Sequence, residues 1–324
     1  MRTARVGADP IDHLLALDPA GRGIAGFFRP GGALSAARAL TAARSVLIVT
    51  GFIVAEGMPE TDGPPGAVVL GRALRRLGAR VRYTSDAAAL PLLESALRTL
   101  GEPPDVFGYP ERANAAAEVL SRERPTHLVA IERPGRSRSG DYLNMRGISV
   151  AQWNRPLDEM FLLARRGGAG RSRGGGAGKR ADRGPTPNGD GSGRGGPRPV
   201  TIGVGDGGNE IGMGSVRELL ARESRMVART ACVVPVDHLV VAGVSNWGAY
   251  GIVAQLGRLT GQPLLHTPAE ERRLIVACVS AGAVDGITRR PEPTVDTLSA
   301  DTHAALVALL GLSWGDFSRR GERS

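Results

Sequence analysis

Cysteine and aromatic residues are scarce in this chain of 324 residues, which contains two cysteines and 4% aromatic residues. Cys232 and Cys278 form no CxxC pair, and no histidine stands at metal-ligand spacing beside either of them. This pattern argues against a cysteine-based metal site. Because each cysteine lies in an apolar run, we expect two buried free thiols, as is usual in a reducing compartment.

Long apolar segments are also missing. No stretch of the sequence approaches the roughly 20 apolar residues of a membrane-spanning helix. Residues 1–18 contain no apolar core, and the acidic Asp9 and Asp12 argue against a secretory or transit peptide. We therefore expect a cytoplasmic protein that has no membrane partner.

Acidic residues are fewer than basic ones, and the formal net charge is +9. Residues 165–199 hold nine basic and two acidic residues, so a net charge of +7 lies in this segment and about +2 in the rest. The segment is rich in Gly, Arg, Pro and Ser and lacks apolar periodicity, which predicts a disordered loop. Its Arg and Gly residues leave RNA contact as an alternative, but without interleaved aromatic residues no nucleic-acid partner is expected.

The basic segment divides the chain into two ordered portions. We expect an N-terminal helical segment at 1–44, a first α/β portion at 45–164, a second α/β portion at 200–315 that completes the catalytic domain, and a flexible tail at 316–324. The two portions are either two domains or one domain that carries an insertion. The sequence indicates no oligomeric state.

Apolar periodicity predicts an alternating α/β pattern. Strands are expected at 45–50, 80–84, 127–131, 200–204 and 238–242. Helices are expected at 66–77, 87–100, 112–123, 215–227, 246–259 and, as the last, 269–279. This pattern favours a mainly parallel sheet flanked by helices in Rossmann-like layers, in which ligands bind beyond the carboxyl ends of the strands.

The loop after the first strand carries two acidic residues, Glu60 and Asp62, beside Thr61 and Gly63. Thr61 or Asp62 could simply cap the following helix, whose free N–H groups attract anions. A cap needs only one carboxylate, however. The second acid favours catalytic roles for Glu60 and Asp62, with Thr61 and Gly63 in contact with a substrate.

The strand at 127–131 leads directly into Glu132 and Arg133, and Arg146 follows in a segment bounded by glycines. Glu132 and Arg133 could form a surface ion pair that contributes little. Alternatively, Arg133 and Arg146 could hold a substrate carboxylate through paired hydrogen bonds. All three residues are candidates for substrate binding.

The segment 203–214 is the most unusual in the chain, with six glycines in twelve residues. So many glycines are costly unless the backbone needs positive φ angles or close approach to a ligand. Gly203, Gly205 and Gly208 formally match the GxGxxG dinucleotide pattern. An ordinary tight turn is the alternative.

Acidic residues within this glycine loop argue against a dinucleotide. Asp206 and Glu210 would repel a pyrophosphate, whereas together with Asn209 they could bind a hard cation such as Mg²⁺ or Mn²⁺, or an amine. We therefore predict catalytic roles for Asp206, Asn209 and Glu210, and substrate contacts for Gly207 and Gly208. Asp206 and Glu210 are the candidate metal ligands.

Two later turns complete the candidate site. Ser245 or Asn246 could cap the helix at 246–259, or Asn246 could orient a substrate while Trp247 forms a wall of its pocket. Asp285 precedes Gly286 in a turn and is a further substrate-binding candidate. No Ser-His-Asp order, nucleophile elbow, Walker loop or HExxH motif is present, so the chemistry would rest on carboxylates, amides and loop N–H groups.

Seven segments in consistent order resemble the D-glutamate cyclase-like family. They are TGF at Thr50, PETDGPPGA at Pro59, IERPG at Ile131, GDYLNMRG at Gly140, GDGGNEIGMG at Gly205, AGVSNWGAYG at Ala242 and VDGIT at Val284. The chain departs from the family in its Arg/Gly-rich insertion, in Leu143, and in a weak match at the final segment 294–297.

The resemblance implies lyase chemistry, in which D-glutamate loses water to give 5-oxo-D-proline and in which a small amino acid is the substrate. Asp206 or Glu210 would then take the ammonium proton, and Arg133 or Arg146 would hold the α-carboxylate. The alternative is a metal-dependent enzyme or binder that acts on another small anionic metabolite, such as a phosphorylated compound held on the glycine loop.

Overall fold

Six parallel strands form the central sheet. The computed structural model describes residues 9–169 and 198–318. The strands are β1 (Ser45–Thr50), β4 (Arg80–Ser85), β5 (Val106–Gly108), β6 (His127–Ile131), β7 (Val200–Gly205) and β8 (His238–Val241), and their spatial order is β5-β4-β1-β6-β7-β8. Numbered along the chain, this order is 3-2-1-4-5-6, that of the doubly wound Rossmann sheet. The predicted fold class is confirmed.

The two portions on either side of the basic segment share this one sheet. β6, which precedes the segment, pairs with β7, which follows it, so that Val129 lies level with Ile202. On its other side β6 pairs with β1, where Val129 lies level with Ile48. The strands β1, β6 and β7 are therefore neighbours, and their carboxyl ends meet at one edge of the sheet.

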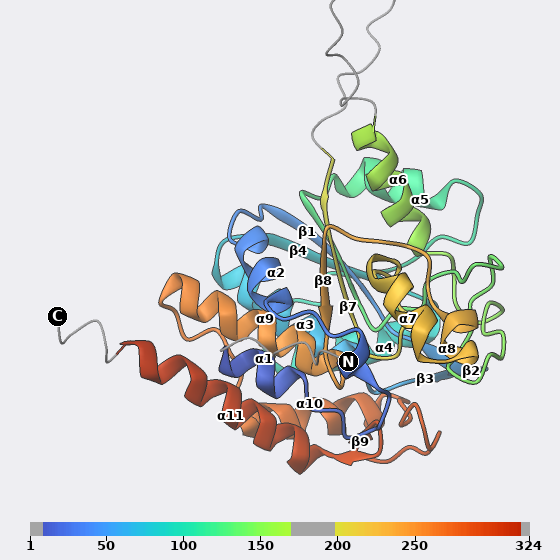
Figure 1. Ribbon diagram of the computed structural model, residues 1–324. Coiled ribbons are helices and arrows are strands. Elements are labelled where there is room, and N and C mark those ends of the chain that lie inside the picture. Colours follow the sequence, from blue (N-terminus) through green and yellow to red (C-terminus); the bar gives the residue numbers. More distant parts are fainter. Residues whose placement is uncertain (1–8, 170–197, 319–324) are drawn as a thin grey trace, which may run out of the picture.

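Helices cover both faces of the sheet (Figure 1). On one face, α2 (Gly32–Leu40) and α3 (Pro64–Arg76) pack against α9 (Ser245–Thr260). Further helices on this side are α1 (Pro10–Leu15), α4 (Leu90–Thr99), α10 (Pro268–Ser280) and α11 (Ala300–Ser318). On the other face, α5 (Ala115–Glu123) contacts α6 (Asp158–Ala169), and the short α7 (Arg217–Glu223) and α8 (Arg225–Thr230) connect β7 to β8. In the described part of the chain, no helix is long and apolar enough to cross a membrane.

Two short hairpins extend the loops of the sheet. β2 (Ile53–Ala55) pairs with β3 (Met58–Pro59) directly after β1, and β9 (Thr294–Val295) pairs with β10 (Leu298–Ser299) before α11. The two hairpins are joined through Thr61, whose N–H donates to the Val284 carbonyl at 2.9 Å and whose hydroxyl donates to the Thr294 carbonyl at 2.8 Å. These contacts bring the segment before α11 next to the loop after β1.

Several predicted elements have different boundaries in the structure. The helix expected at 215–227 is divided, because Ser224 is extended and its hydroxyl accepts the Val227 N–H at the start of α8. The segment 269–279 is not the last helix, since the Ala- and Leu-rich α11 follows it.

The basic segment and the tail also begin differently from their predicted limits. α6 continues through Arg165 to Ala169, where basic side chains suit the carboxyl end of a helix. The first five residues of the predicted disordered loop are therefore helical, and residues 170–197 lie outside the described residues. Residues 316–318, expected in a flexible tail, belong to α11.

Candidate active site

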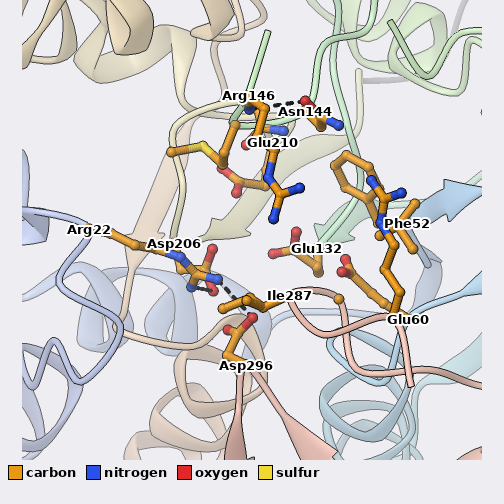
Figure 2. A pocket seen from close by; sticks show the side chains of 15 residues that line it. Arg22, Phe52, Glu60, Glu132, Asn144, Arg146, Asp206, Glu210, Ile287 and Asp296 are labelled. Atoms are coloured by element: carbon orange, nitrogen blue, oxygen red, sulfur yellow. Dashed lines mark hydrogen bonds and ion pairs between the residues drawn. The ribbon is translucent and has the colours of Figure 1, made fainter. Parts of the chain in front are cut away.

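A cavity of about 230 Å³ lies where the loops after β1, β6 and β7 meet (Figure 2). Five acidic side chains line it, and they come from four separate segments: Glu60 after β3, Glu132 after β6, Asp206 and Glu210 in the glycine loop after β7, and Asp296 in the β9–β10 turn. All five are almost fully buried. Such a site, at the carboxyl ends of adjacent parallel strands, is where doubly wound proteins bind ligands.

A reciprocal pair of caps holds two helices at the cavity. The Asp62 carboxylate accepts the N–H groups of Ser245 at 3.0 Å and Asn246 at 2.8 Å, at the start of α9. The Asn246 amide oxygen in turn accepts the N–H groups of Gly63 at 3.0 Å and Gly66 at 2.7 Å, at the start of α3. Each side chain satisfies free N–H groups of the other's segment, so both helix starts are fixed relative to each other.

Glu132 is held by contacts on two sides. Its carboxylate accepts the Ser245 hydroxyl at 2.6 Å, and its backbone has a φ of 42°. Gly63, with a φ of 100°, lies so close that a Cβ there would be 2.9 Å from the Cβ of Glu132 and 2.6 Å from the hydroxyl of Thr50. Only glycine combines this backbone angle with so little space.

The glycine loop folds around its own acid. The Glu210 carboxylate accepts the N–H groups of Gly207 and Gly208, both at 2.8 Å, and the Asn209 amide donates to the Leu143 carbonyl at 2.9 Å. An added Cβ at Gly207 would lie 2.8 Å from Glu210 Oε1. The N–H groups that would bind a phosphate in a dinucleotide loop are therefore already paired with a carboxylate.

Arg22 is a site residue that the sequence prediction missed. Its guanidinium forms ion pairs with Asp206 at 2.5 Å and Asp296 at 2.7 Å, and it donates to the Gly243 carbonyl at 3.3 Å. Asp18 accepts the Arg22 backbone N–H at 2.9 Å and thereby shapes the loop that carries it. Figure 2 shows Arg22 entering the pocket beside Asp206. The local sequence gives one indication that Arg22 has a defined position, namely the turn anchored by Asp18 with Gly21 and Gly23 on either side of the arginine.

Asp296 was likewise absent from the predicted site residues. It lies at the turn between β9 and β10 with a φ of 52°. The neighbouring Val295 carbonyl contacts Nε2 of His303 at 3.2 Å, while Nδ1 of His303 accepts the Trp247 indole N–H at 2.8 Å. Trp247 thus supports the hairpin of Asp296 rather than lining the cavity.

The buried acids have unusual protonation behaviour. Burial raises the pKa of Glu60, Glu132 and Asp206 well above the usual carboxyl range, and neighbouring carboxylates raise it further. The positive charge of Arg22 opposes this rise at Asp206. Burial and the nearby Asp296 raise the pKa of Asp62 to about 7, against the N–H bonds from Asn246 and Ser245. Carboxyls of this kind can exchange protons near neutral pH, which suits acid–base catalysis.

Three of the acids have the geometry of a cation site. Asp62, Glu132 and Asp206 each place a carboxylate oxygen within 4.8 Å of the other two. Three carboxylates form a donor set that suits a hard divalent cation such as Mg²⁺ or Mn²⁺. Of the two metal ligands expected from the sequence, Asp206 belongs to this triad. Glu210 is not one of the three.

The two arginines predicted to bind substrate lie in different environments. Arg133 is fully buried, forms an ion pair with Asp86, and donates to the carbonyls of Gly51 at 2.9 Å and Arg155 at 2.7 Å. It is not among the residues that line the cavity, whereas Arg146 is.

Asp285 and Thr61 lie behind the cavity. Asp285 accepts the Thr294 hydroxyl and the Thr297 N–H, both at 2.7 Å, and is not a lining residue. Thr61 is fully buried between the two hairpins. Both residues shape the loops around the site.

The sheet order and the acidic cavity define a doubly wound α/β protein with a pocket equipped for acid–base chemistry on a small polar ligand. The sequence matches the profile of the family described as D-glutamate cyclase-like, C-terminal, over residues 11–178 and 193–311. The chain therefore belongs to this family, and the resemblance seen in its seven motifs is confirmed.

The comparisons also identify individual similar proteins. The human protein named D-glutamate cyclase, mitochondrial, is 34% identical in an alignment of 262 residues that covers 76% of this chain and 38% of the human protein. The chain thus spans less than two-fifths of that relative. An exopolyphosphatase-related protein from Bacteroides fragilis aligns structurally over 90% of this chain and 59% of its own, with 9% identity and a TM-score of 0.39. That similarity is too distant to support a functional comparison.

Proposed function

We propose that this protein is a lyase that cyclises D-glutamate to 5-oxo-D-proline with loss of water. The observation that carries the proposal is the convergence of buried carboxyls with raised pKa values in one small cavity. Family membership and the name of the human relative support the same reaction. A small amino acid is the proposed partner, and the cytoplasm is the proposed location.

The reaction makes specific demands on proton transfer. The amine nitrogen attacks the γ-carbon, a C–N bond forms, a C–O bond breaks, and the departing oxygen leaves as water with two protons that began on the ammonium group. The protein must therefore take protons from nitrogen and deliver them to oxygen. We assign this transfer to Asp206 and Glu132, which line the cavity and whose raised pKa values suit both steps.

The other acids have supporting roles in this proposal. Glu60 lines the cavity, where its carboxyl oxygens can accept hydrogen bonds from the ammonium group. Glu210 and Asn209 hold the glycine loop that presents Asp206. Binding a folded conformation of the substrate brings the amine close to the γ-carbon and reduces the entropic part of the barrier.

A divalent cation, if required, would be held by Asp62, Glu132 and Asp206. Mg²⁺ or Mn²⁺ bound there would supply positive charge next to an oxygen that becomes negative during the reaction. Carboxylates that ligate a cation are ionised, so a cation at this site would take the place of the proton transfer assigned to Asp206 and Glu132, and the reactions with a chelator distinguish the two proposals.

The alternative substrate, a phosphorylated metabolite held on the glycine loop, has less support. The N–H groups of Gly207 and Gly208 are both bonded to Glu210, and the cavity around them is lined by acids. A thermal-shift screen separates the two proposals, since only a ligand that binds the folded state raises the melting temperature. Stabilisation by D-glutamate or 5-oxo-D-proline supports the cyclase, and stabilisation by nucleotides or sugar phosphates supports the alternative.

The direct test is incubation of the purified chain with D-glutamate in the absence of ATP, with chiral chromatography of the product. L-Glutamate is the control substrate, and parallel reactions contain Mg²⁺, Mn²⁺ or a chelator. We expect 5-oxo-D-proline from D-glutamate.

Variants then assign the residues. Asp206→Asn should reduce kcat roughly 10²- to 10⁴-fold, the usual range for a group that transfers protons. The matched control is Glu56→Gln, which changes an exposed acid of the β2–β3 turn that does not line the cavity. Wild-type turnover by a folded Asp206→Asn protein, or by a folded Glu132→Gln protein, would contradict the assignment.

A further inference from the structure

Three arginines line the acidic cavity, and they differ in their partners. Arg22 is committed to Asp206 and Asp296. The side chains of Arg146 and Arg289 form no hydrogen bond or ion pair with any residue that the structure describes, although both line the cavity. The guanidinium groups of Arg146 and Arg289 are therefore available to bind a negatively charged group of a ligand.

Both of these arginines stand on loops that are themselves well anchored. The Asn144 amide oxygen accepts the N–H groups of Arg146 and Ile148, both at 3.0 Å, and thereby fixes the turn around Arg146. In Figure 2 the Arg146 side chain extends from this turn toward the middle of the pocket. A fixed backbone under a side chain without a protein partner is typical of a binding residue.

Arg289 is anchored by Asp285. The Asp285 carboxylate accepts the N–H groups of Ile287 at 3.0 Å and Thr288 at 2.9 Å, and its carbonyl accepts the Arg289 N–H at 2.8 Å. Arg289 has a φ of 59°, an uncommon and costly angle for a residue other than glycine. Asp285, which the sequence suggested as a substrate contact, thus acts through the loop that carries Arg289.

The arrangement of charge fits a ligand with one positive and two negative groups. Buried carboxylates form the interior and attract an ammonium group, while two guanidinium groups from separate loops offer paired donors for carboxylates. The cavity, at about 230 Å³, is smaller than the usual pocket for a drug-sized molecule. An amino dicarboxylate matches both the charge pattern and the size.

We propose that Arg146 and Arg289 each bind one carboxylate of an amino dicarboxylate and so restrict the substrate to that class. This inference rests on the proposed function and deepens it. The guanidinium group on the γ-carboxylate has a second effect, because it neutralises the charge that would otherwise repel the electron pair of the attacking amine. The other guanidinium group, on the α-carboxylate, holds the substrate in position.

The test compares binding of D-glutamate with that of two analogues by isothermal titration calorimetry. D-Glutamine lacks the γ-carboxylate, and 4-aminobutyrate lacks the α-carboxylate. The wild-type chain should bind D-glutamate more tightly than either analogue. Arg146→Gln and Arg289→Gln should each raise the dissociation constant for D-glutamate roughly 10- to 100-fold, as expected for loss of a charged hydrogen bond.

The pattern of preference identifies which arginine binds which carboxylate. One variant should lose its preference for D-glutamate over D-glutamine, and the other its preference over 4-aminobutyrate. The controls are Arg290→Gln and Arg138→Gln, which change exposed neighbours that do not line the cavity, and these should bind all three ligands like the wild type. Arg146 and Arg289 are exposed, so the variants should keep the wild-type melting temperature.

Binding and turnover together separate failure of this inference from failure of the proposed function. If the predicted binding pattern occurs without any turnover, the proposed roles of Arg146 and Arg289 in binding are supported and the proposed cyclase reaction is wrong. If D-glutamate is cyclised but both variants bind it like the wild type, the proposed binding roles of the two arginines are wrong and the proposed reaction is supported. If the wild-type chain does not bind D-glutamate, both are wrong.

Discussion

At the scale of single residues, the site is defined by how its charges are balanced. Five acidic side chains line the cavity, and Arg22 is the cation that pairs with two of them. Its positive charge lowers the pKa of Asp206, Glu60 and Asp62, against the larger effect of burial. Arg22 therefore reduces the electrostatic cost of gathering these acids in one place.

Replacement of Arg22 by methionine should expose that cost. Methionine keeps the apolar stem but removes the charge, and loss of one partner from a buried pair costs roughly 3–5 kcal/mol of folding free energy. The pKa values of the acids should then rise further. When an acid has a higher pKa in the folded state than in the unfolded state, the free energy of unfolding falls as the pH rises from the lower pKa to the higher one.

The loss of melting temperature in Arg22→Met should therefore be larger at pH 8 than at pH 6, as measured by thermal unfolding at both pH values. Arg29→Met, at an exposed arginine of the same N-terminal segment, is the control. An equal loss at the two pH values would show that Arg22 contributes by packing and not by its charge.

At the scale of elements, the site depends on two helix starts that meet. Asp62 from the loop before α3 caps α9, and Asn246 from α9 caps α3. Gly63 makes this close approach possible, since it lies against Thr50 and Glu132. The position of Glu132 is thus tied to the packing of α3 against α9.

Replacement of Gly63 by alanine should disturb both stability and activity. The matched control is Gly57→Ala, because Gly57 also has a positive φ, of 66°, but an added Cβ there meets no atom within 4 Å. The control should cost about 1 kcal/mol, the usual penalty of that backbone angle for alanine. Gly63→Ala should cost roughly 1–3 kcal/mol more, because its Cβ would overlap Thr50 and Glu132.

Denaturant unfolding measures the two costs, and turnover of D-glutamate measures the displacement of Glu132. Equal unfolding free energies for the two variants would mean that the loop moves aside without strain, and the tight contact at Gly63 would then have no energetic significance.

The sequence predicted elements well where the signal is local. The buried strands at 45–50 and 127–131 are short apolar runs between polar residues, and both are strands over those residues. The acids of the glycine loop argued against a pyrophosphate site, and in the structure Glu210 bonds the N–H groups of Gly207 and Gly208. The sequence did not reveal this pairing, and it predicted substrate contacts for the two glycines.

Other parts of the site depend on contacts that a single sequence does not reveal. The ion pairs of Arg22 join positions far apart in the chain, and nothing beside Arg22 or Asp296 marks them as partners. Arg133 and Arg146 both follow the same strand. Only the fold shows that Asp86 holds the former in the interior while the latter reaches the cavity.

At the scale of the whole molecule, the site draws on both sides of the basic segment. Glu132 precedes it and Asp206 follows it, and the pairing of β6 with β7 places them side by side at the edge of the sheet. We propose that residues 45–164 and 200–315 form one catalytic domain, with the basic segment as an insertion between α6 and β7.

Replacement of residues 170–197 by a short Gly/Ser linker should therefore leave catalysis intact. The described residues that line the cavity all lie within 9–169 or 198–318. The expected result is kcat and KM for D-glutamate within about twofold of wild type, together with lower affinity for polyanions because basic residues are removed. Loss of turnover in a variant with the wild-type melting temperature would instead support a functional role for the Arg/Gly-rich segment.

The pairing of β6 with β7 also has a bearing on the order in which the acidic cavity is assembled during synthesis. When the chain has been synthesised up to Ala169, four of the six strands of the sheet have been made, but Asp206, Asn246 and Asp296 have not. The acidic cluster is therefore assembled last, once most of the scaffold is present. A chain that ends before β7 therefore lacks Asp206 and Asp296, and with them the ion pairs that Arg22 makes in the cavity.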